Sequence, residues 1–226
     1  MDVRTAGVAL ALGLAPLPAA ANSALPAGFV DVAQIVPSAQ FDVRYYGTDN
    51  FVGARVEGYD APRCFLTEAA ARALAKVAAD AGQQNLRLRI FDCYRPARAV
   101  AHFGRWAADL SDQRTKPAYY PDVDKGDLFK EGYIAARSGH SRGSTLDLTL
   151  IDASTGSDLD MGTPFDLFGM RSWPDSPDVT AAQRTNRDRL AALMMRNGFK
   201  PFDKEWWHFT LRDEPFPDTY FDFPIR

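Results

Sequence analysis

The sequence predicts a single α+β domain, with a mainly antiparallel sheet flanked by about three main helices. Three observations support this class. The 226 residues are 46% hydrophobic, which is enough to build one substantial core. Helical and strand patterns follow one another without the regular βαβ alternation of a parallel sheet. No internal repeat, heptad or low-complexity block follows the first 21 residues.

The first predicted helix covers residues 67–81. Thr67 suits the N-cap, Glu68 suits the first turn, and apolar residues then recur on one face until Gly82 can end the helix. Residues 86–90 alternate between apolar and basic side chains, which predicts a strand with one buried face.

A second helix is predicted to begin at Pro96, which suits the N1 position. Its apolar face is expected to carry Phe103, Trp106, Ala107 and Leu110. Residues 111–132 are rich in Asp, Lys, Pro and Tyr and predict a long loop. Loop length alone suggests the hypothesis that this loop, which contains Tyr119 and Tyr120, covers a pocket.

Two further strands and one helix complete the predicted domain. Residues 144–151 form a strand that bears Asp147, and residues 206–211 form a strand that carries His208. Between them, Thr180 and Gln183 make a capping box that opens a third helix, closed by Asn197 and Gly198.

Residues 1–21 have the features of a secretory signal. One positive charge in residues 1–4 precedes the apolar run 6–14, and the small residues 19–21 resemble a cleavage site. The run is too short to span a membrane. We therefore expect export to the periplasm and a mature domain of residues 22–226; the alternative is an alanine-rich tail.

The two cysteines, Cys64 and Cys93, suit an exported protein. In an oxidising compartment they can form one disulfide. The alternative is a pair of buried free thiols, which are common in protein cores. We favour the disulfide because of the signal-like start.

The charge balance argues against some classes of partner. Charged residues make up 24% of the chain and the net charge is -3. Such a balance gives no electrostatic footprint for nucleic acid or for an anionic membrane. A small-molecule substrate is the expected partner.

Two short segments contain a combination typical of a catalytic zinc site. The first holds His140 and Asp147, and the second holds Glu205 and His208. Such sites use three protein ligands and leave a position open for water, and a non-ligating glutamate can take the proton of that water. Of the three histidines in the chain, His102 is expected to be structural.

The spacing of these residues requires the backbone to depart from a regular strand. His140 and Asp147 are separated by an odd offset, as are Glu205 and His208, so each pair would face opposite sides of a regular strand. A turn near Gly143 would bring the first pair together, and a local bend would do the same for the second.

The sequence resembles the D-alanyl-D-alanine dipeptidases, zinc peptidases of the kind that support vancomycin resistance. The resemblance runs from about residue 41 to residue 226. Its ordered motifs are Tyr45, Asp49–Phe51, Asp92–Pro96, Tyr119–Asp122, Ser138–Gly143, Asp160–Asp166, Glu205–His208 and Asp218–Pro224.

The resemblance implies a role for each residue of the site. It implies one zinc ion per chain, held by His140, Asp147 and His208, with Glu205 as the general base and Arg95 stabilising the transition state. It further implies that the ends of the substrate are anchored by Tyr45, Ser138 and Asp166. The structural alternatives are a salt bridge at the start of a helix for Arg95 and a surface charge for Asp166.

The resemblance implies zinc-dependent hydrolysis of D-Ala-D-Ala to two D-alanines. A second hypothesis is a carboxypeptidase or endopeptidase that acts on longer wall peptides. A third is an inactive wall-binding module, although a structural zinc would require neither Glu205 nor Arg95.

Overall fold

A computed structural model describes residues 1–2 and 25–226 of the chain. The predicted signal segment, residues 1–21, lies almost entirely outside the described residues. Within the described part, no helix is long and apolar enough to cross a membrane.

The centre of the fold is a five-stranded mixed sheet with strand order β2-β4-β5-β7-β6. Only β2 runs parallel to its neighbour β4, and the other pairs are antiparallel. The strands are β2 Gln40–Phe41, β4 Leu86–Asp92, β5 Thr145–Asp152, β6 Phe199–Phe202 and β7 Glu205–Leu211. The predicted α+β class with a mainly antiparallel sheet is confirmed.

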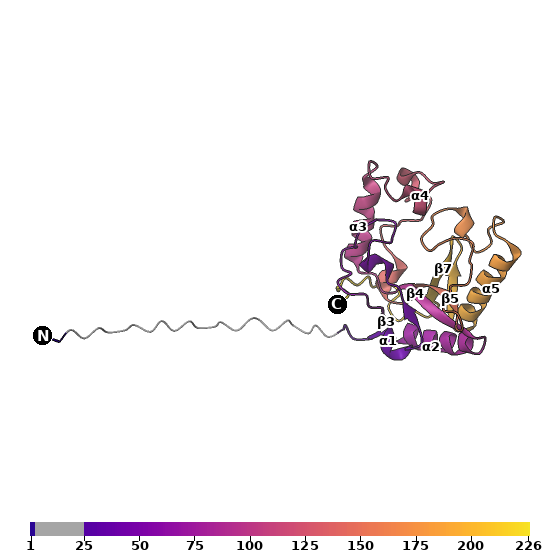
Figure 1. The fold of residues 1–226 in the computed structure, drawn as a ribbon, viewed down its shortest axis with the longest axis horizontal. Coiled ribbons are helices and arrows are strands. Elements are labelled where there is room, and N and C mark those ends of the chain that lie inside the picture. The colour runs from indigo at the N-terminus through magenta and orange to yellow at the C-terminus, as the bar shows by residue number, and fades with distance from the viewer. Residues whose placement is uncertain (3–24) are drawn as a thin grey trace.

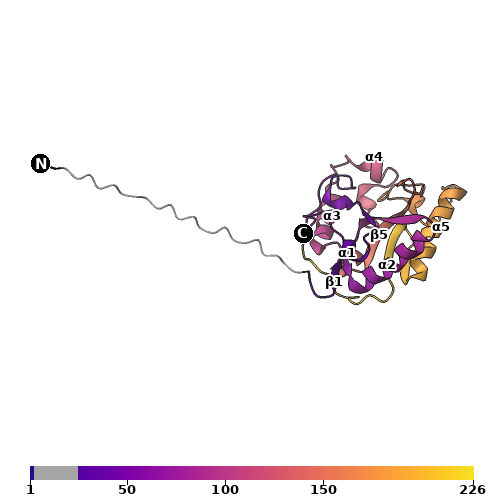
Figure 2. The same cartoon turned by 60° about the horizontal axis from the view of Figure 1, so that its bottom comes forward.

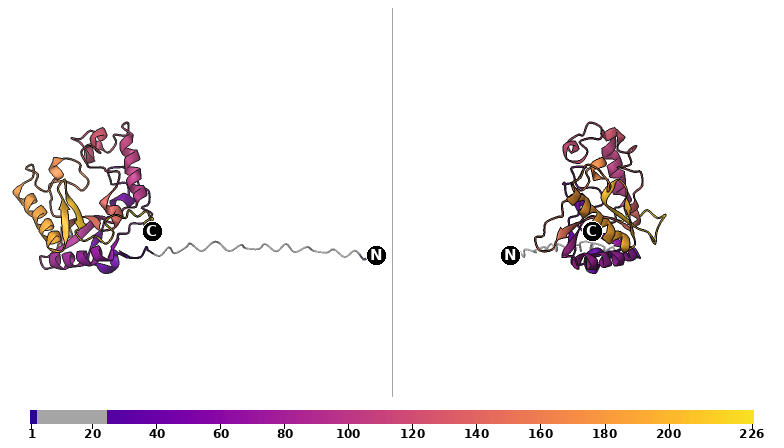
Figure 3. Two further views of the ribbon diagram at one scale, coloured as in Figure 1. Left: turned by 180° about the vertical axis from the view of Figure 1, so that it is seen from behind. Right: turned by 90° about the vertical axis from the view of Figure 1, so that its right-hand side faces the viewer.

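The part of the chain that the structure describes contains three long helices beside this sheet, as predicted. They are α2 Glu68–Gly82, α3 Ala97–Ala108 and α5 Ala181–Arg196. The first and last pack against each other and against the sheet. Helix α3 lies on the other side of the molecule with the short helix α4 Lys116–Tyr119, as Figures 1 and 3 show.

A small two-stranded sheet joins the beginning of the domain to α2. Strands β1 Phe29–Asp31 and β3 Phe65–Thr67 are antiparallel, and α1 Val32–Ile35 follows β1 directly. The C-terminal segment returns to this region, where the ring of Phe223 stacks on Tyr94 with centroids 4.0 Å apart. Figure 2 shows the C-terminus beside these early elements.

The helix caps follow the predicted chemistry closely. The Thr67 side chain accepts a hydrogen bond from the Ala70 amide, and Thr180 forms a complete capping box with Gln183. These side chains satisfy amide groups that have no partner inside the helix.

Several predicted boundaries are wrong. Pro96 is the N-cap of α3 rather than its first residue, and Leu110 is exposed because the helix has already ended at Ala108. The predicted loop 111–132 contains α4 and a 3-10 turn, Lys125–Asp127.

Candidate active site and metal centre

Three acidic and basic side chains form one row across the centre of the sheet. Asp92 on β4 pairs with Asp147 on β5, and Asp147 pairs with His208 on β7. Residues that pair directly across strands project from the same face of a sheet. The sheet therefore places a carboxylate and an imidazole from distant parts of the chain next to each other.

His140 reaches the same place from outside the sheet. It lies in a 3-10 turn, Gly139–Arg142, which ends at Gly143 with φ of 80°. A Cβ atom on Gly143 would collide with the ring of Phe29, so this position requires glycine for its conformation and for its space. The predicted turn at Gly143 is confirmed, and it resolves the odd spacing between His140 and Asp147.

Three candidate ligand atoms converge at this point. His140 Nε2 lies 3.3 Å from Asp147 Oδ1 and 3.3 Å from His208 Nδ1, and the latter two atoms are 3.1 Å apart. Ligand atoms around a tetrahedral ion with bonds of about 2.0–2.2 Å lie about 3.3–3.6 Å apart. The three atoms therefore fit one small divalent metal ion.

The surroundings of these atoms support the same conclusion. Among the described residues, no donor meets the buried Asp147 Oδ1 with hydrogen-bonding geometry, although the two imidazole nitrogens lie near it. Burial acts to raise the pKa of Asp147, but the two histidines more than offset it, and the pKa lies below its ordinary value. A buried carboxylate oxygen that faces two imidazole nitrogens is a metal-binding arrangement.

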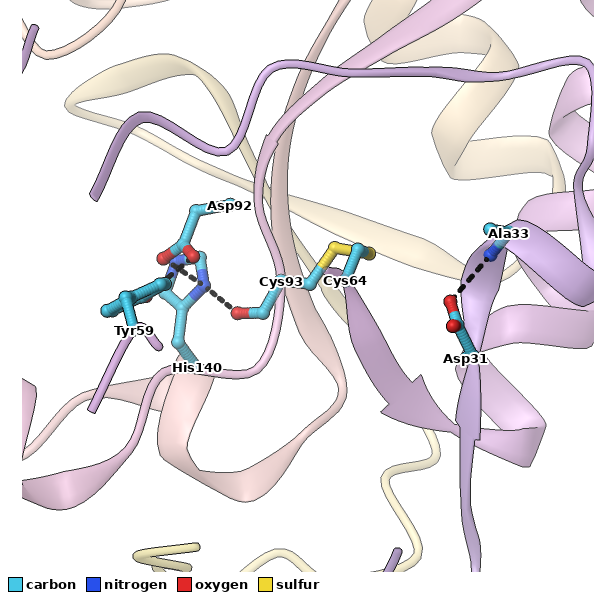
Figure 4. The surroundings of a disulfide bond; sticks show 7 residues. All are labelled: Asp31, Ala33, Tyr59, Cys64, Asp92, Cys93 and His140. Atoms are coloured by element: carbon cyan, nitrogen blue, oxygen red, sulfur yellow. Dashed lines mark hydrogen bonds and ion pairs between the residues drawn. A yellow bond between two sulfur atoms is a disulfide. The ribbon is translucent and has the colours of Figure 1, made fainter. Parts of the chain in front are cut away.

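The other nitrogen of His140 has a defined partner. His140 Nδ1 lies 2.7 Å from the carbonyl oxygen of Cys93, as Figure 4 shows. A carbonyl only accepts hydrogen bonds, so Nδ1 carries the proton and Nε2 keeps its lone pair toward the cluster. Metal-bound histidines are commonly oriented in this way.

Glu205 lies beside the cluster at the start of β7. Its Oε2 is 3.5 Å from His208 Nδ1. The pairing of β6 with β7 is irregular between Pro201 and Phe202, which pairs with Glu205. A local bend of this kind was expected from the three-residue spacing of Glu205 and His208, and it brings the two side chains together. Burial raises the pKa of Glu205 to about 7, against the lowering effect of His208.

Arg95 directs a positive charge into the site. Its Nε donates to Asp92 Oδ2 at 2.9 Å, and its Nη2 lies 3.5 Å from Asp147 Oδ2. The guanidinium also lies over the ring of Tyr45, 5.0 Å from the centroid. Arg95 thus makes a salt bridge near the helix start, which is the structural alternative, and its guanidinium also lies beside Asp147 of the three-residue cluster.

Asp166 is a buried carboxylate, not a surface charge. It is 4% exposed and accepts a 2.8 Å hydrogen bond from the hydroxyl of Tyr45. Burial, followed by the charge of Asp147, raises its pKa well above the usual range. Its φ of 62° is uncommon for a residue other than glycine. Of the residues that the structure describes, none forms an ion pair with Asp166.

All eight predicted site residues line one cavity of about 280 Å³. They are Tyr45, Arg95, Ser138, His140, Asp147, Asp166, Glu205 and His208. Ser138 accepts a hydrogen bond from the His140 amide through its Oγ, so its hydroxyl hydrogen can still be donated. His102 is structural as expected, since its Nδ1 accepts from the Glu57 amide.

Of the predicted loop 111–132, Gly132 lines the cavity. Neither Tyr119 nor Tyr120 lines the cavity; Tyr120 is fully buried elsewhere. The wall comes instead from residues just before the turn that bears His140, and from Phe168. Those wall residues are Gly132, Tyr133, Ile134, Ala135 and Arg137.

Sequence reasoning assigned no role to Asp92 and Tyr59. Asp92 is 1% exposed, and its Oδ1 accepts a 2.7 Å hydrogen bond from the Tyr59 hydroxyl. Asp92 therefore holds Arg95 on one side and Tyr59 on the other. Its position three residues before Arg95 could have indicated an ion pair between the two residues. Only the β4–β5 pairing shows that Asp92 lies beside Asp147.

Comparison with known proteins agrees with this geometry. A family model described as D-ala-D-ala dipeptidase, of the peptidase M15 group, matches residues 26–226. The chain belongs to this dipeptidase family.

Named relatives match nearly the whole chain. The D-alanyl-D-alanine dipeptidase of Enterococcus faecium is 41% identical over 88% of this chain and 98% of its own length. The enzyme of that name from Streptomyces coelicolor is 44% identical over 87% and 98%, and that from Escherichia coli K12 is 38% identical over 80% and 83%. The resemblance seen in the motifs is confirmed, and the chain is a metallopeptidase of this family.

Proposed function

We propose that this protein hydrolyses the dipeptide D-Ala-D-Ala to two D-alanines with one zinc ion per chain. The observation that carries the proposal is the shared cavity: the His140, Asp147 and His208 cluster and the buried carboxylate of Asp166 line the same space of about 280 Å³. The names of the matching relatives support this substrate.

His140, Asp147 and His208 would hold the zinc ion, because two imidazoles and one carboxylate form a common catalytic ligand set. A bound zinc ion polarises the scissile carbonyl and brings water toward ionisation near neutral pH. The remaining chemistry belongs to side chains of the chain itself.

Glu205 is the proposed general base. It is buried, it does not belong to the three-atom cluster, and its Oε2 lies within 3.5 Å of the cluster at His208 Nδ1. Burial raises the pKa of Glu205 above its ordinary value in the metal-free site, which favours a carboxylate that can take a proton from water and return it to the leaving amine.

Arg95 is proposed to stabilise the charge that develops on the substrate carbonyl oxygen. Asp92 fixes its guanidinium, and the rings of Tyr45 and Phe103 lie against it at about 5 Å. A cation held in place before the reaction needs little reorganisation as the charge develops, which is the basis of electrostatic catalysis.

Asp166 and Tyr45 are proposed to bind the substrate ammonium. A buried carboxylate that forms no ion pair within the described structure gains most from a cationic ligand, and that ligand would restore its charged form. Ser138, on the turn that bears His140, would donate its hydroxyl hydrogen to the substrate carboxylate.

The alternative is a peptidase that acts on longer wall peptides. The cavity of about 280 Å³ falls below the range of about 300–1,000 Å³ that is usual for drug-sized ligands, which favours a dipeptide. Hydrolysis rates on D-Ala-D-Ala, on its N-acetyl derivative and on a wall pentapeptide would test this. We expect the free dipeptide to react fastest, and faster cleavage of the pentapeptide would overturn the proposal.

We further propose that the protein acts outside the cytoplasm, in salvage or remodelling of wall fragments. The signal-like residues 1–21 support this, as does the disulfide, because such bonds persist in oxidising compartments. Mass spectrometry of the periplasmic fraction should find a chain that begins near residue 22. An uncleaved chain in the cytoplasm would contradict it.

A further inference from the structure

Cys93 forms a disulfide and also contacts His140, one of the three proposed metal ligands. It forms a disulfide with Cys64, their Cα atoms lying 5.3 Å apart, and its carbonyl oxygen accepts from His140 Nδ1 at 2.7 Å. Figure 4 shows the two contacts on opposite sides of the residue, with the side chain turned toward Cys64 and the carbonyl toward the imidazole. Both cysteines are 2% exposed.

Cys93 lies just beyond the last residue of the central sheet on its strand. Strand β4 stops at Asp92, its pairing with β5 is irregular between Ile90 and Asp92, and α3 begins only at Ala97. Two hydrogen bonds hold the segment that follows: the Tyr94 amide donates to the carbonyl of Phe65, and the Arg95 amide donates to the carbonyl of His140. The first of these bonds is made by the same peptide group that carries the Cys93 carbonyl, so the Tyr94 amide and the Cys93 side chain hold this group from its two sides.

Cys64 provides a firm attachment for that segment. It precedes β3 directly, and its carbonyl accepts a 2.9 Å hydrogen bond from the Val32 amide. The disulfide therefore ties the end of β4 to the small β1–β3 sheet through a second, covalent connection beside the Tyr94–Phe65 hydrogen bond.

We propose that the Cys64–Cys93 disulfide is a positioning element of the metal site, which holds the Cys93 carbonyl against His140 and so keeps Nε2 directed at the ion. The inference rests on the proposed metal site. Without the disulfide, the Tyr94–Phe65 hydrogen bond alone would hold the Cys93 peptide group. A shift of its carbonyl would then let the imidazole turn or change tautomer, and the ion would meet a protonated nitrogen. Outer-shell partners of this kind typically change metal affinity by about 10–100-fold.

Zinc affinity is the measurement that tests this, because a purely structural disulfide would leave it unchanged. The wild type would be compared with Cys64→Ala/Cys93→Ala, by competition with a chromophoric chelator. Alanine is preferable to chemical reduction, because free thiols bind zinc themselves. Leu193→Ala, which removes a buried side chain on α5, outside the elements that carry the cysteines, provides a matched control for lost stability.

A second readout reports on the ligand directly. Cobalt replaces zinc in such sites and its visible spectrum depends on ligand geometry. An imidazole ¹H–¹⁵N spectrum of the zinc-loaded protein can show whether His140 carries its proton on Nδ1. Circular dichroism and the melting temperature would establish that each variant is folded.

We expect the double variant to bind zinc about 10–100-fold more weakly, with an altered cobalt spectrum, while Leu193→Ala binds as the wild type does. Equal affinity in all three proteins would overturn the inference, as would equal weakening in the variant and the control. A double variant that does not fold would also overturn it, since the disulfide would then hold the domain and not the ligand. A folded wild type that binds no zinc would instead refute the proposed metal site itself.

Discussion

The hydroxyl of Tyr45 donates a 2.8 Å hydrogen bond to Asp166, a residue 121 positions further along the chain. Both side chains are almost completely buried, and both line the cavity that His140, Asp147 and His208 also line. This pair places a buried carboxylate in the cavity wall, which is suited to one ammonium group.

Asp166→Asn should weaken recognition of the free amino group. A hydrogen bond to a charged group is worth about 1.5–3 kcal/mol, so kcat/KM for D-Ala-D-Ala should fall roughly 10–150-fold. Steady-state kinetics on D-Ala-D-Ala and on its N-acetyl derivative would check this. The variant should discriminate less between the two substrates, and an unchanged preference would count against Asp166 as the anchor.

Arg95→Lys should reduce turnover more than substrate binding. A lysine keeps the charge but loses the planar fork that Asp92 holds, and the loss of one fixed electrostatic donor costs about 10²–10³-fold in kcat. Arg98→Lys is a matched control, since Arg98 pairs with Asp222 at the surface. Equal effects of the two substitutions would show that Arg95 has no special role.

Removing the metal should abolish activity and lower the melting temperature. Whatever binds the folded state alone stabilises it, and a free ligand concentration 100 times Kd contributes about 2.7 kcal/mol. Differential scanning calorimetry with and without zinc would measure the shift. His208→Ala should eliminate it, whereas His102→Ala should preserve it; a zinc-dependent shift that survives in His208→Ala would refute the ligand assignment.

Arg187→Met should destabilise the loop that carries Asp166. Arg187 is 2% exposed and donates to three carbonyl groups, those of Met161, Arg171 and Trp173. An unsatisfied buried acceptor costs about 1–3 kcal/mol, so the free energy of unfolding should fall by at least about 2 kcal/mol. Urea denaturation would measure this, and Arg189→Met, on the exposed face of α5, should change it by less than about 0.5 kcal/mol.

The sequence was sufficient to locate the helices and strands that have capping residues or a clear periodic pattern. The capping residues Thr67 and Thr180 and the strand pattern at 86–90 each contain enough periodic or capping information to locate an element. Strands β1 and β3 have only three residues each, which is too few to show a period of two. Pro96 fits the N-cap and the next position equally well, because its fixed φ suits both.

The site residues were predicted by their motifs, but their geometry depends on pairing between distant strands. Nothing local to Asp92 indicates that it stands beside Asp147, and nothing near Cys93 indicates that its carbonyl meets His140. Such relationships arise from sheet register and tertiary packing, which one sequence read along its length does not contain.

The most direct test of the account is the release of D-alanine from D-Ala-D-Ala by the zinc-loaded protein, measured beside Glu205→Gln. Glutamine keeps the shape of the side chain but cannot accept the proton, so turnover should fall about 10²–10⁴-fold at equal zinc content. Turnover by the wild type and its loss in this variant are the results that the account predicts. A folded, zinc-loaded wild type that releases no D-alanine, or a variant as active as the wild type, would contradict it.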